Sequence, residues 1–437
     1  MLRENILLKL GVLFLFVSVC ANAEESYQLN AQTTFITQGH SIFPSPYSGK
    51  NSLQSVEDAQ TSQTLTLYSG LNLGKFGELY FNPELTGGMG LSQTEGVAGF
   101  PNAEIYRVSG AAPVWAIARF YLKKVFALSE DSDKGSQENI EAGLNQLPMD
   151  YAVDRLTLVL GKYALNDFFD NNSYSHDPRT QFLNWVLMDY GAWDYAADTR
   201  GYSWGLMMEL NHKSWALRYS SVLEPQFANQ MNLDLNVAQA HGDNLEYEYR
   251  YSYREQPGVL RVLIFNNHAF MGNYQSAVAL NSVAPDVTAT RQYSQKYGGG
   301  LNWEQAASAD FGWHGRLSWN DGHTETWAFT EIDQSETVGF SWMPHFWSKL
   351  KDTVGCAIIV NDLSPWHRAY LASGGYGFII GDGQLNYASE KILETYYLLQ
   401  LNKSAAVTLD YQFVSAPGYN ADRGPVSIFA VRIHGEI

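Results

Sequence analysis

Large apolar or aromatic side chains alternate with polar ones in many short stretches of this sequence. Residues 245–255, LEYEYRYSYRE, show the pattern most clearly: Leu245 and the tyrosines at every second position after it alternate with glutamate, arginine and serine. Successive side chains of an extended chain point to opposite faces. The stretch therefore predicts a β-strand with one apolar, aromatic face and one charged face.

The same alternation recurs along the whole chain, in segments of about 9–12 residues, which is close to the length that a tilted strand needs to cross a bilayer core. Clear examples are found near residues 64–73, 311–320, 405–414 and 427–435. We distinguish about seventeen such segments, the first near 27–37. Because bacterial single-chain barrels have an even number of strands, we expect 16 to 18.

The connections between these segments fall into two classes. Short connections rich in Gly, Asn, Ser and Pro are predicted at 72–77, 211–214, 255–258 and 402–404. Long connections are predicted at 38–61, 87–112, 164–200, 224–243, 271–292 and 362–388. Short turns at one end and long loops at the other are typical of outer-membrane barrels. Residues 129–146 are acidic and poor in apolar residues, and we expect them to form a mobile loop.

Two architectures are compatible with a single strand of this kind. In a soluble sandwich the aromatic faces pack together, whereas in a membrane barrel they face lipid and the charges face a water-filled lumen. Sixteen or so strands without helices favour the barrel, and so does the aromatic content of 14%, which includes 27 Tyr and 12 Trp, against only 17% charged residues. We therefore predict an all-β protein, a transmembrane antiparallel up-and-down β-barrel. The mid-strand arginines are expected to face the lumen: Arg250, Arg254, Arg316 and Arg432.

The N-terminal residues 1–23 have the pattern of a secretory signal peptide, with a basic start, an apolar run and a small-residue cleavage site. The rest, 24–437, is predicted to be a single barrel domain. Only Cys356 remains after cleavage, so no internal disulfide and no cysteine metal site is expected. The formal charge of −17 argues against a nucleic-acid partner, and no cofactor is predicted.

Residues 166–200 are the first candidate for the functional site, because they combine aromatic side chains with carboxylates, amides and arginines. Aromatic faces stack on the C–H faces of sugars, and polar groups pair with sugar hydroxyls. Asp177 followed by Pro178 predicts the start of a short helix that ends near Gly191 and lies inside the barrel or over its mouth. The candidate residues of this region are Asp170, Asn171, Arg179, Trp185 and Asp189.

Residues 80–107 are the second candidate, predicted as a glycine-rich loop that carries Glu84, Glu104 and Arg107. Paired carboxylates can serve acid–base hydrolysis, but a ring of charges at a constriction is the more common use in such a loop. No catalytic residue is predicted, because the histidine pairs, nucleophile elbow and dinucleotide fingerprint of common enzymes are missing from the sequence.

Several long stretches resemble the carbohydrate-selective porin family of the OprB type, and together they cover most of the chain after residue 23. They include FITQGHSIFPSPYSGKNSL (35–53), GELYFNPELTGGMGLSQTEGVAGFPNAE (77–104), DRLTLVLGKYALNDFFDNNSYSHDPRTQFLNW (154–185) and HRAYLASGGYGFIIGDG (367–383). The resemblance implies a sixteen-stranded outer-membrane barrel that passes sugars by facilitated diffusion. It also implies that the channel is narrowed by 80–107 and 164–200. The final residue, Ile437, departs from the aromatic that usually ends such chains.

The sequence therefore predicts a porin in the bacterial outer membrane for mono- and oligosaccharides, in contact with lipid and present as a monomer or trimer. The acidic balance predicts a mild preference for cations. Two alternatives remain open: a barrel of another kind, such as a membrane-embedded hydrolase or a surface receptor, and a soluble secreted β-protein.

Overall fold

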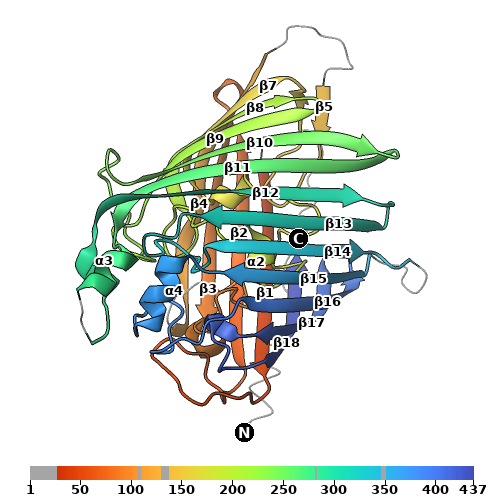
Figure 1. Cartoon of the computed structure of the whole chain (residues 1–437). Helices are drawn as coiled ribbons and strands as arrows, with labels where there is room; N and C mark the ends of the chain where they lie inside the picture. Colours follow the sequence, from red (N-terminus) through yellow and green to blue (C-terminus); the bar gives the residue numbers. More distant parts are fainter. Residues whose placement is uncertain (1–26, 106–109, 129–136, 281–282, 346–350) are drawn as a thin grey trace.

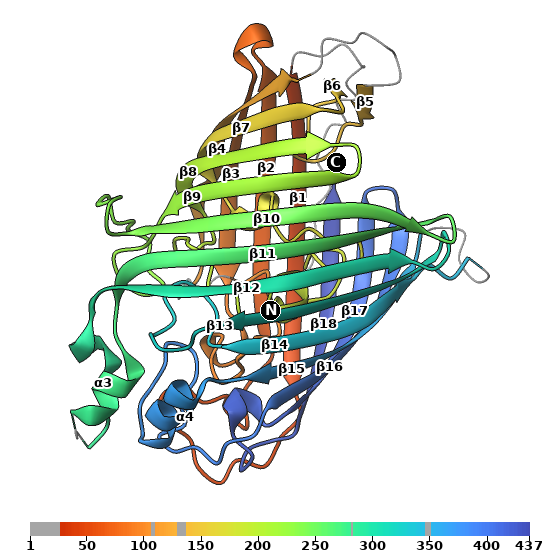
Figure 2. The same ribbon diagram turned by 45° about the horizontal axis from the view of Figure 1, so that its top comes forward.

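The computed structural model describes residues 27–105, 110–128, 137–280, 283–345 and 351–437. Within them, sixteen antiparallel strands form one closed barrel, which confirms the predicted fold (Figures 1 and 2). Neighbours along the barrel are neighbours in sequence, and β1 closes the ring by pairing with β18. The strands are β1 (Tyr27–His40), β2 (Gln60–Asn72), β3 (Glu78–Gly88), β4 (Gly110–Ala127), β7 (Arg155–Tyr163), β8 (Ser203–His212), β9 (Trp215–Leu223), β10 (His241–Tyr253), β11 (Gln256–Met271), β12 (Gln292–Ala306), β13 (Phe311–Asn320), β14 (Gln334–Trp342), β15 (Thr353–Asp362), β16 (Glu390–Asn402), β17 (Ala405–Ser415) and β18 (Val426–Glu436).

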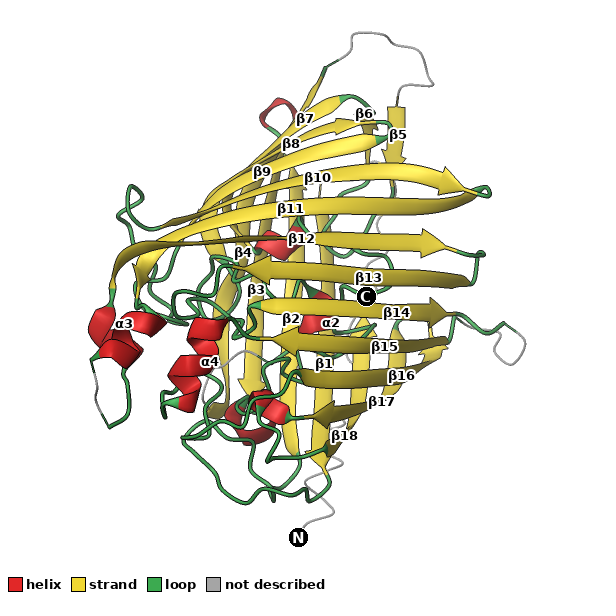
Figure 3. Ribbon diagram, viewed as in Figure 1, coloured by secondary structure: helices red, strands yellow, loops and turns green. Residues whose placement is uncertain are grey.

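The two ends of the barrel differ as the sequence predicts. At one end, called the turn end below, strands are joined by short connections such as 213–214, 254–255 and 403–404. At the other, the loop end, all six predicted long loops are found, together with two that the sequence analysis missed, 321–333 and 416–425. Helices α3 (Tyr274–Ala279) and α4 (Pro365–Ala372) lie at the loop end (Figure 3). Among the described residues, no helix has the length and apolar character needed to cross a membrane.

The barrel wall sorts its side chains as the alternation predicts. On β10, Tyr247 is 44% exposed and Tyr249 45%, whereas Glu248 between them is only 4% exposed. On β13, Trp313 is 42% exposed and Arg316 only 2%. A closed barrel has a single wall, so the exposed aromatic rows form its outer surface and the polar rows face inward.

The interior is less open than the wet lumen expected from the sequence. Arg316 and Arg432 do face inward, but both are buried beneath the segment 164–202, which folds back into the barrel. Arg432 Nη1 donates to the backbone oxygens of Pro178 and Gln181, both at 2.7 Å. The inward orientation predicted for these two arginines is confirmed, but their hydrogen-bonding groups hold a loop instead of facing open water.

The other two mid-strand arginines of the prediction have different positions. Arg254 lies in the β10–β11 turn with a positive φ of 50°, so it is not a strand residue. Arg250 is on β10, where its Nε donates to Glu248 Oε1 at 2.6 Å.

Carboxylates on the inner wall hold the same segment through its backbone. Glu246 on β10, Glu304 on β12 and Glu394 on β16 accept hydrogen bonds from the backbone N–H groups of residues 170, 173, 183 and 184, at 2.5–3.1 Å. A hydrogen bond of this kind contributes about 0.5–1.5 kcal/mol net. These contacts fix segment 164–202 across the barrel.

The helix inside the barrel is shorter than predicted and starts later. Helix α2 (Trp185–Met188) is capped by the Asn184 side chain, which accepts from Val186 N at 3.0 Å (Figure 3). Asp177 caps only a single turn, in which Gln181 N donates to Asp177 O. Glu394 on the barrel wall binds the backbone N–H groups of residues 183 and 184, and this interrupts the predicted helix between the turn at Asp177 and helix α2.

A hairpin occupies part of the turn end. Of the predicted acidic loop 129–146, residues 129–136 lie outside the described residues. The strand β5 (Gln137–Ile140) lies within the rest of that loop and pairs with β6 (Met149–Ala152), which follows the loop, in a two-stranded sheet. Leu147 between them is 1% exposed and approaches the wall at Tyr80, whose hydroxyl accepts from Leu147 N at 3.3 Å. Tyr151 donates to the inward carboxylate of Glu78. This hairpin, residues 137–152, narrows the turn end beside β2–β4.

Candidate functional site

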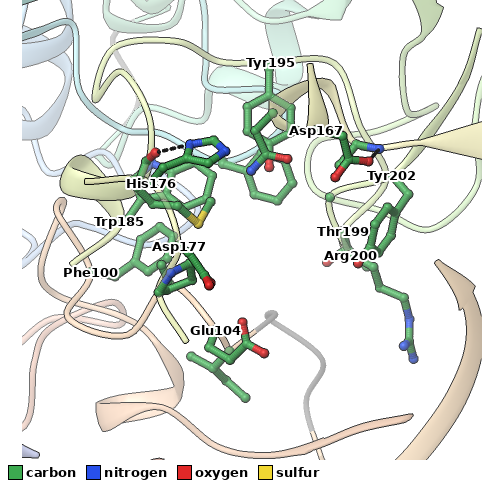
Figure 4. Close-up of a pocket in the computed structure, with 18 of the residues that line it drawn as sticks. Phe100, Glu104, Asp167, His176, Asp177, Trp185, Tyr195, Thr199, Arg200 and Tyr202 are labelled. Atoms are coloured by element: carbon green, nitrogen blue, oxygen red, sulfur yellow. Dashed lines mark hydrogen bonds between the residues drawn. The ribbon is translucent and has the colours of Figure 1, made fainter. Parts of the chain in front are cut away.

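The two candidate regions meet inside the barrel and enclose a cavity of about 390 Å³ (Figure 4). The loop between β3 and β4 runs alongside segment 164–202, with Ala103 N donating to Leu183 O at 2.8 Å and Trp185 N to Phe100 O at 3.1 Å. The cavity volume lies within the usual range for small-molecule sites. Sequence segments about eighty residues apart therefore form one site.

An aromatic platform forms one side of this cavity. Phe100 stacks on Trp185 with ring centroids 5.0 Å apart, and Tyr195 also stacks on Trp185, at 5.9 Å. Phe329 from the β13–β14 loop completes the group, 4.8 Å from Tyr195. Offset stacking of this kind fixes the ring planes. The platform presents a rigid apolar surface to the cavity.

An ion-pair group lies beside the platform. Arg179 Nε donates to Glu104 Oε1 at 2.7 Å, and Arg179 Nη2 lies 3.6 Å from Glu84 Oε2. Burial raises the pKa of Glu104 above its ordinary value of 4.5, although the charge of Arg179 and a hydrogen bond from Thr64 lower it in part. Glu84 lies on the inward face of β3, so the prediction of a loop over 80–107 is wrong for 80–88.

Two neighbouring groups, Asp177 and His176, are both deprotonated at neutral pH and therefore differ in charge. Burial alone would raise the pKa of Asp177, but the charge of Arg179 and hydrogen bonds from Arg179 N and Thr180 hold it below its ordinary value. Burial lowers the pKa of His176, and the charge of Arg316 lowers it further. The cavity therefore has an ionised Asp177 next to a neutral imidazole.

The opposite side of the cavity is built from the barrel wall and the two ends of segment 164–202. Arg119 on β4 forms a two-point ion pair with Asp167, in which Nε donates to Oδ2 at 2.8 Å and Nη2 to Oδ1. Tyr202 donates to Glu84 Oε1 at 3.2 Å, and Arg200 lies beside it (Figure 4). Guanidinium, carboxylate and phenol groups thus face the platform across the cavity.

The predicted site residues occupy three kinds of position. Glu104, Asn171, Arg179 and Trp185 line the cavity, and Glu84 lies behind Arg179. Asp170 and Asp189 are fully buried away from it. Arg107 lies outside the described residues.

The two buried aspartates hold segment 164–202 in place. Both oxygens of Asp170 accept from Arg316 Nε at 3.0 Å, and Asp189 accepts from Asn166 at 3.1 Å. Burial raises the pKa of Asp189 well above its ordinary value, and the nearby charge of Asp170 adds to the shift.

Sequence reasoning missed Arg119 because of a β-bulge. Trp115 and Ile117 point outward, so strict alternation places residue 119 outside as well. The register between β3 and β4 shifts at Asn82 and Pro83, and beyond it Phe120 points outward instead. An inserted residue of this kind turns the following side chains to the other face. The proline on the partner strand, which lacks an N–H, is the one sequence signal for it.

The pH dependence of ion selectivity should report on Glu104. As pH falls from 7, this carboxyl protonates before Asp177, because its pKa is raised and that of Asp177 is lowered. The cavity then loses a negative charge, and we expect its preference for cations to fall. The Glu104→Gln variant should show a lower cation preference at pH 7 and no such step on acidification. Reversal potentials in a salt gradient between pH 7 and 5 measure this, and an unchanged pH profile in the variant would contradict it.

Among the described residues, no group of three or more His, Cys, Asp or Glu side chains is arranged to hold a metal ion.

Comparison with protein families gives one match, the carbohydrate-selective porins of the OprB family, over residues 50–436. The chain belongs to this family. The porin is thus a channel of the bacterial outer membrane through which carbohydrates diffuse, which confirms the function and location predicted from the sequence.

Solved structures share the fold of this porin. The high-pH structure of Pseudomonas putida OprB matches with a TM-score of 0.67 at 14% identity, covering 95% of each chain. The outer-membrane channel DcaP of Acinetobacter baumannii matches with a TM-score of 0.50 at 8% identity, covering 94% of the porin and 97% of DcaP. At these identities the likeness concerns the fold alone. No curated protein sequence matches the porin.

Proposed function

We propose that sugars cross this porin through the cavity between the aromatic platform and the charged wall. The supporting observation is the arrangement itself: Trp185 and its stacked neighbours face ion-paired arginines and carboxylates across about 390 Å³. A pyranose ring has apolar C–H faces and an equatorial ring of hydroxyls. The faces fit the platform and the hydroxyls fit the charged groups.

The constriction of this pathway consists of Glu104, Asn171, Arg179 and Trp185, with Glu84 behind Arg179. We assign Asp170 and Asp189 to the support of segment 164–202, because neither touches the cavity. Binding has to be weak enough for a sugar to leave again, which suits a site that holds its ligand by one stack and a few hydrogen bonds. Both mono- and oligosaccharides fit this scheme.

The proposal contains no catalytic step. Glu84 and Glu104 both contact Arg179, so the two carboxylates share one counter-ion and hold the loop. A membrane-embedded hydrolase would require an acid and a base placed on opposite sides of a bound sugar. The outer rows of Tyr, Trp and Leu are assigned to contact with lipid, as in other membrane barrels.

Sugar-dependent block of the current through single channels in a planar bilayer tests this proposal. In the double variant Trp185→Ala, Arg179→Ala we expect the affinity for a neutral sugar such as glucose to fall about tenfold or more, corresponding to about 1.4 kcal/mol. General ion conductance should stay high, because the barrel wall is unchanged.

A matched control is Trp313→Ala, which removes the same ring from the lipid-facing surface of β13. This variant should bind sugar like the unaltered porin. Equal sugar block in the double variant and the control would show that the cavity is not the sugar pathway.

A further inference from the structure

One guanidinium of the cavity has no anionic partner. Arg200, near the end of segment 164–202, lines the cavity and is only 4% exposed. Its Nη1 donates to the neutral hydroxyl of Thr86 at 3.0 Å. None of the ion pairs within the described part of the chain involves Arg200. The other two arginines of the cavity are paired, Arg119 with Asp167 and Arg179 with Glu104.

The carboxylate closest to Arg200 in sequence is already engaged by other groups. Asp198 Oδ1 accepts from the backbone N–H groups of Arg200 and Tyr202, at 2.9 and 3.2 Å. Asp198 Oδ2 accepts from Lys162 Nζ at 3.0 Å. The counter-ion of Asp198 is therefore Lys162 and not Arg200.

The free edge of Arg200 has the geometry that binds a carboxylate. The Nε and Nη2 atoms form one edge of a guanidinium, and Arg119 uses this edge to hold both oxygens of Asp167 in the same cavity. No hydrogen bond from the Nε or Nη2 of Arg200 is found among the described residues, and neither is one of the fully buried side-chain atoms without a partner. A buried guanidinium without a counter-ion is unfavourable, and a carboxylate matches its planar fork with two hydrogen bonds.

We propose that Arg200 is a carboxylate-binding subsite, and that this porin carries acidic monosaccharides, such as uronates, in addition to neutral sugars. This inference rests on the proposed sugar pathway. The carboxylate of the sugar pairs with Nε and Nη2 of Arg200, while its ring occupies the space between that wall and the platform. Figure 4 shows Arg200 on the side of the cavity opposite Trp185 and Phe100. A single monosaccharide can therefore contact Arg200 and the aromatic platform at the same time.

Current block by glucuronate and by glucose, measured on the same channels, tests the subsite. We expect glucuronate to block the unaltered porin at about a tenfold lower concentration than glucose, because a charge-assisted two-point contact is added. In Arg200→Gln the ratio between the blocking concentrations of glucose and glucuronate should fall from about ten to about one, which is a loss specific to glucuronate. Arg200→Lys, which keeps the charge but loses the fork, should retain part of the preference.

The outcomes separate this inference from the proposed function. Equal block of the unaltered porin by both sugars would overturn the subsite, and so would an equal loss of both in Arg200→Gln, since Arg200 would then serve sugar hydroxyls in general. Block by glucose 6-phosphate that is tighter than block by glucuronate and is lost in Arg200→Gln would overturn the carboxylate assignment in favour of a phosphate. If neither glucose nor glucuronate blocks the unaltered porin, the sugar pathway itself is wrong.

Normal ion conductance and an unchanged response of gel mobility to heating establish that each variant has folded.

Discussion

Replacing Asp170 with asparagine is expected to release segment 164–202 from the barrel wall. Asp170 and Arg316 form an ion pair at 3.0 Å in which both side chains are almost completely buried. Breaking one partner of a buried pair costs about 3–5 kcal/mol, because the remaining charge has no counter-ion. Asparagine suits the left-handed backbone at this position, where φ is 54°, so the loss of charge is the main change.

Two measurements check this prediction. The temperature at which the barrel unfolds in detergent should fall, and single-channel conductance should rise as the displaced segment uncovers the lumen. The control is Asp243→Asn, the same exchange at a partly exposed position on the outer face of β10, which should change neither quantity. Unaltered conductance and unfolding temperature in Asp170→Asn would show that the wall holds the segment without this pair.

Deleting residues 137–152 is expected to widen the turn end and raise conductance while leaving sugar block intact. The hairpin fills that end through Leu147, Tyr151 and Asn145, which contact β3 and β4. The wall itself does not need it, because β4 pairs directly with β7 from Phe120 to Ala127. The sugar cavity is made by other loops, so its affinity for glucose should be unchanged.

The single substitution Leu147→Asp provides a second variant with the full chain length. Leu147 is 1% exposed, so a charge there should dislodge the hairpin. Single-channel conductance and glucose block should then follow the deletion. A conductance equal to that of the unaltered porin in both variants would show that the hairpin does not limit flow.

The barrel could be predicted from sequence because the direction of the side chains along a strand alternates with a period of two residues. Glu246 and Tyr247 point in opposite directions wherever they are placed on a strand, and only their preference for water or lipid decides which is inside. One pattern repeated over sixteen strands leaves few alternatives. The rule fails where the backbone departs from it, as at the β4 bulge that turns Arg119 inward.

The interior depended on contacts between distant residues and was predicted less well. The composition of 166–200 indicated a loop inside the barrel, but it could not show which of its carboxylates face the cavity. Asp170 is removed from the cavity by Arg316, which is 146 residues away. The helix start at Asp177 was wrong for a similar reason, because Glu394 binds the backbone at 183 and 184 and moves the cap to Asn184. Local sequence contains no trace of such partners.

The way in which the wall grips the loops also bears on how such channels diversify. Glu246, Glu304 and Glu394 bind peptide N–H groups, which every residue except proline possesses. The side chains of the loop are then free to be exchanged without loosening its attachment. A lineage of these proteins can alter which nutrient it admits by replacing a few loop residues, while the scaffold that presents them is inherited unchanged.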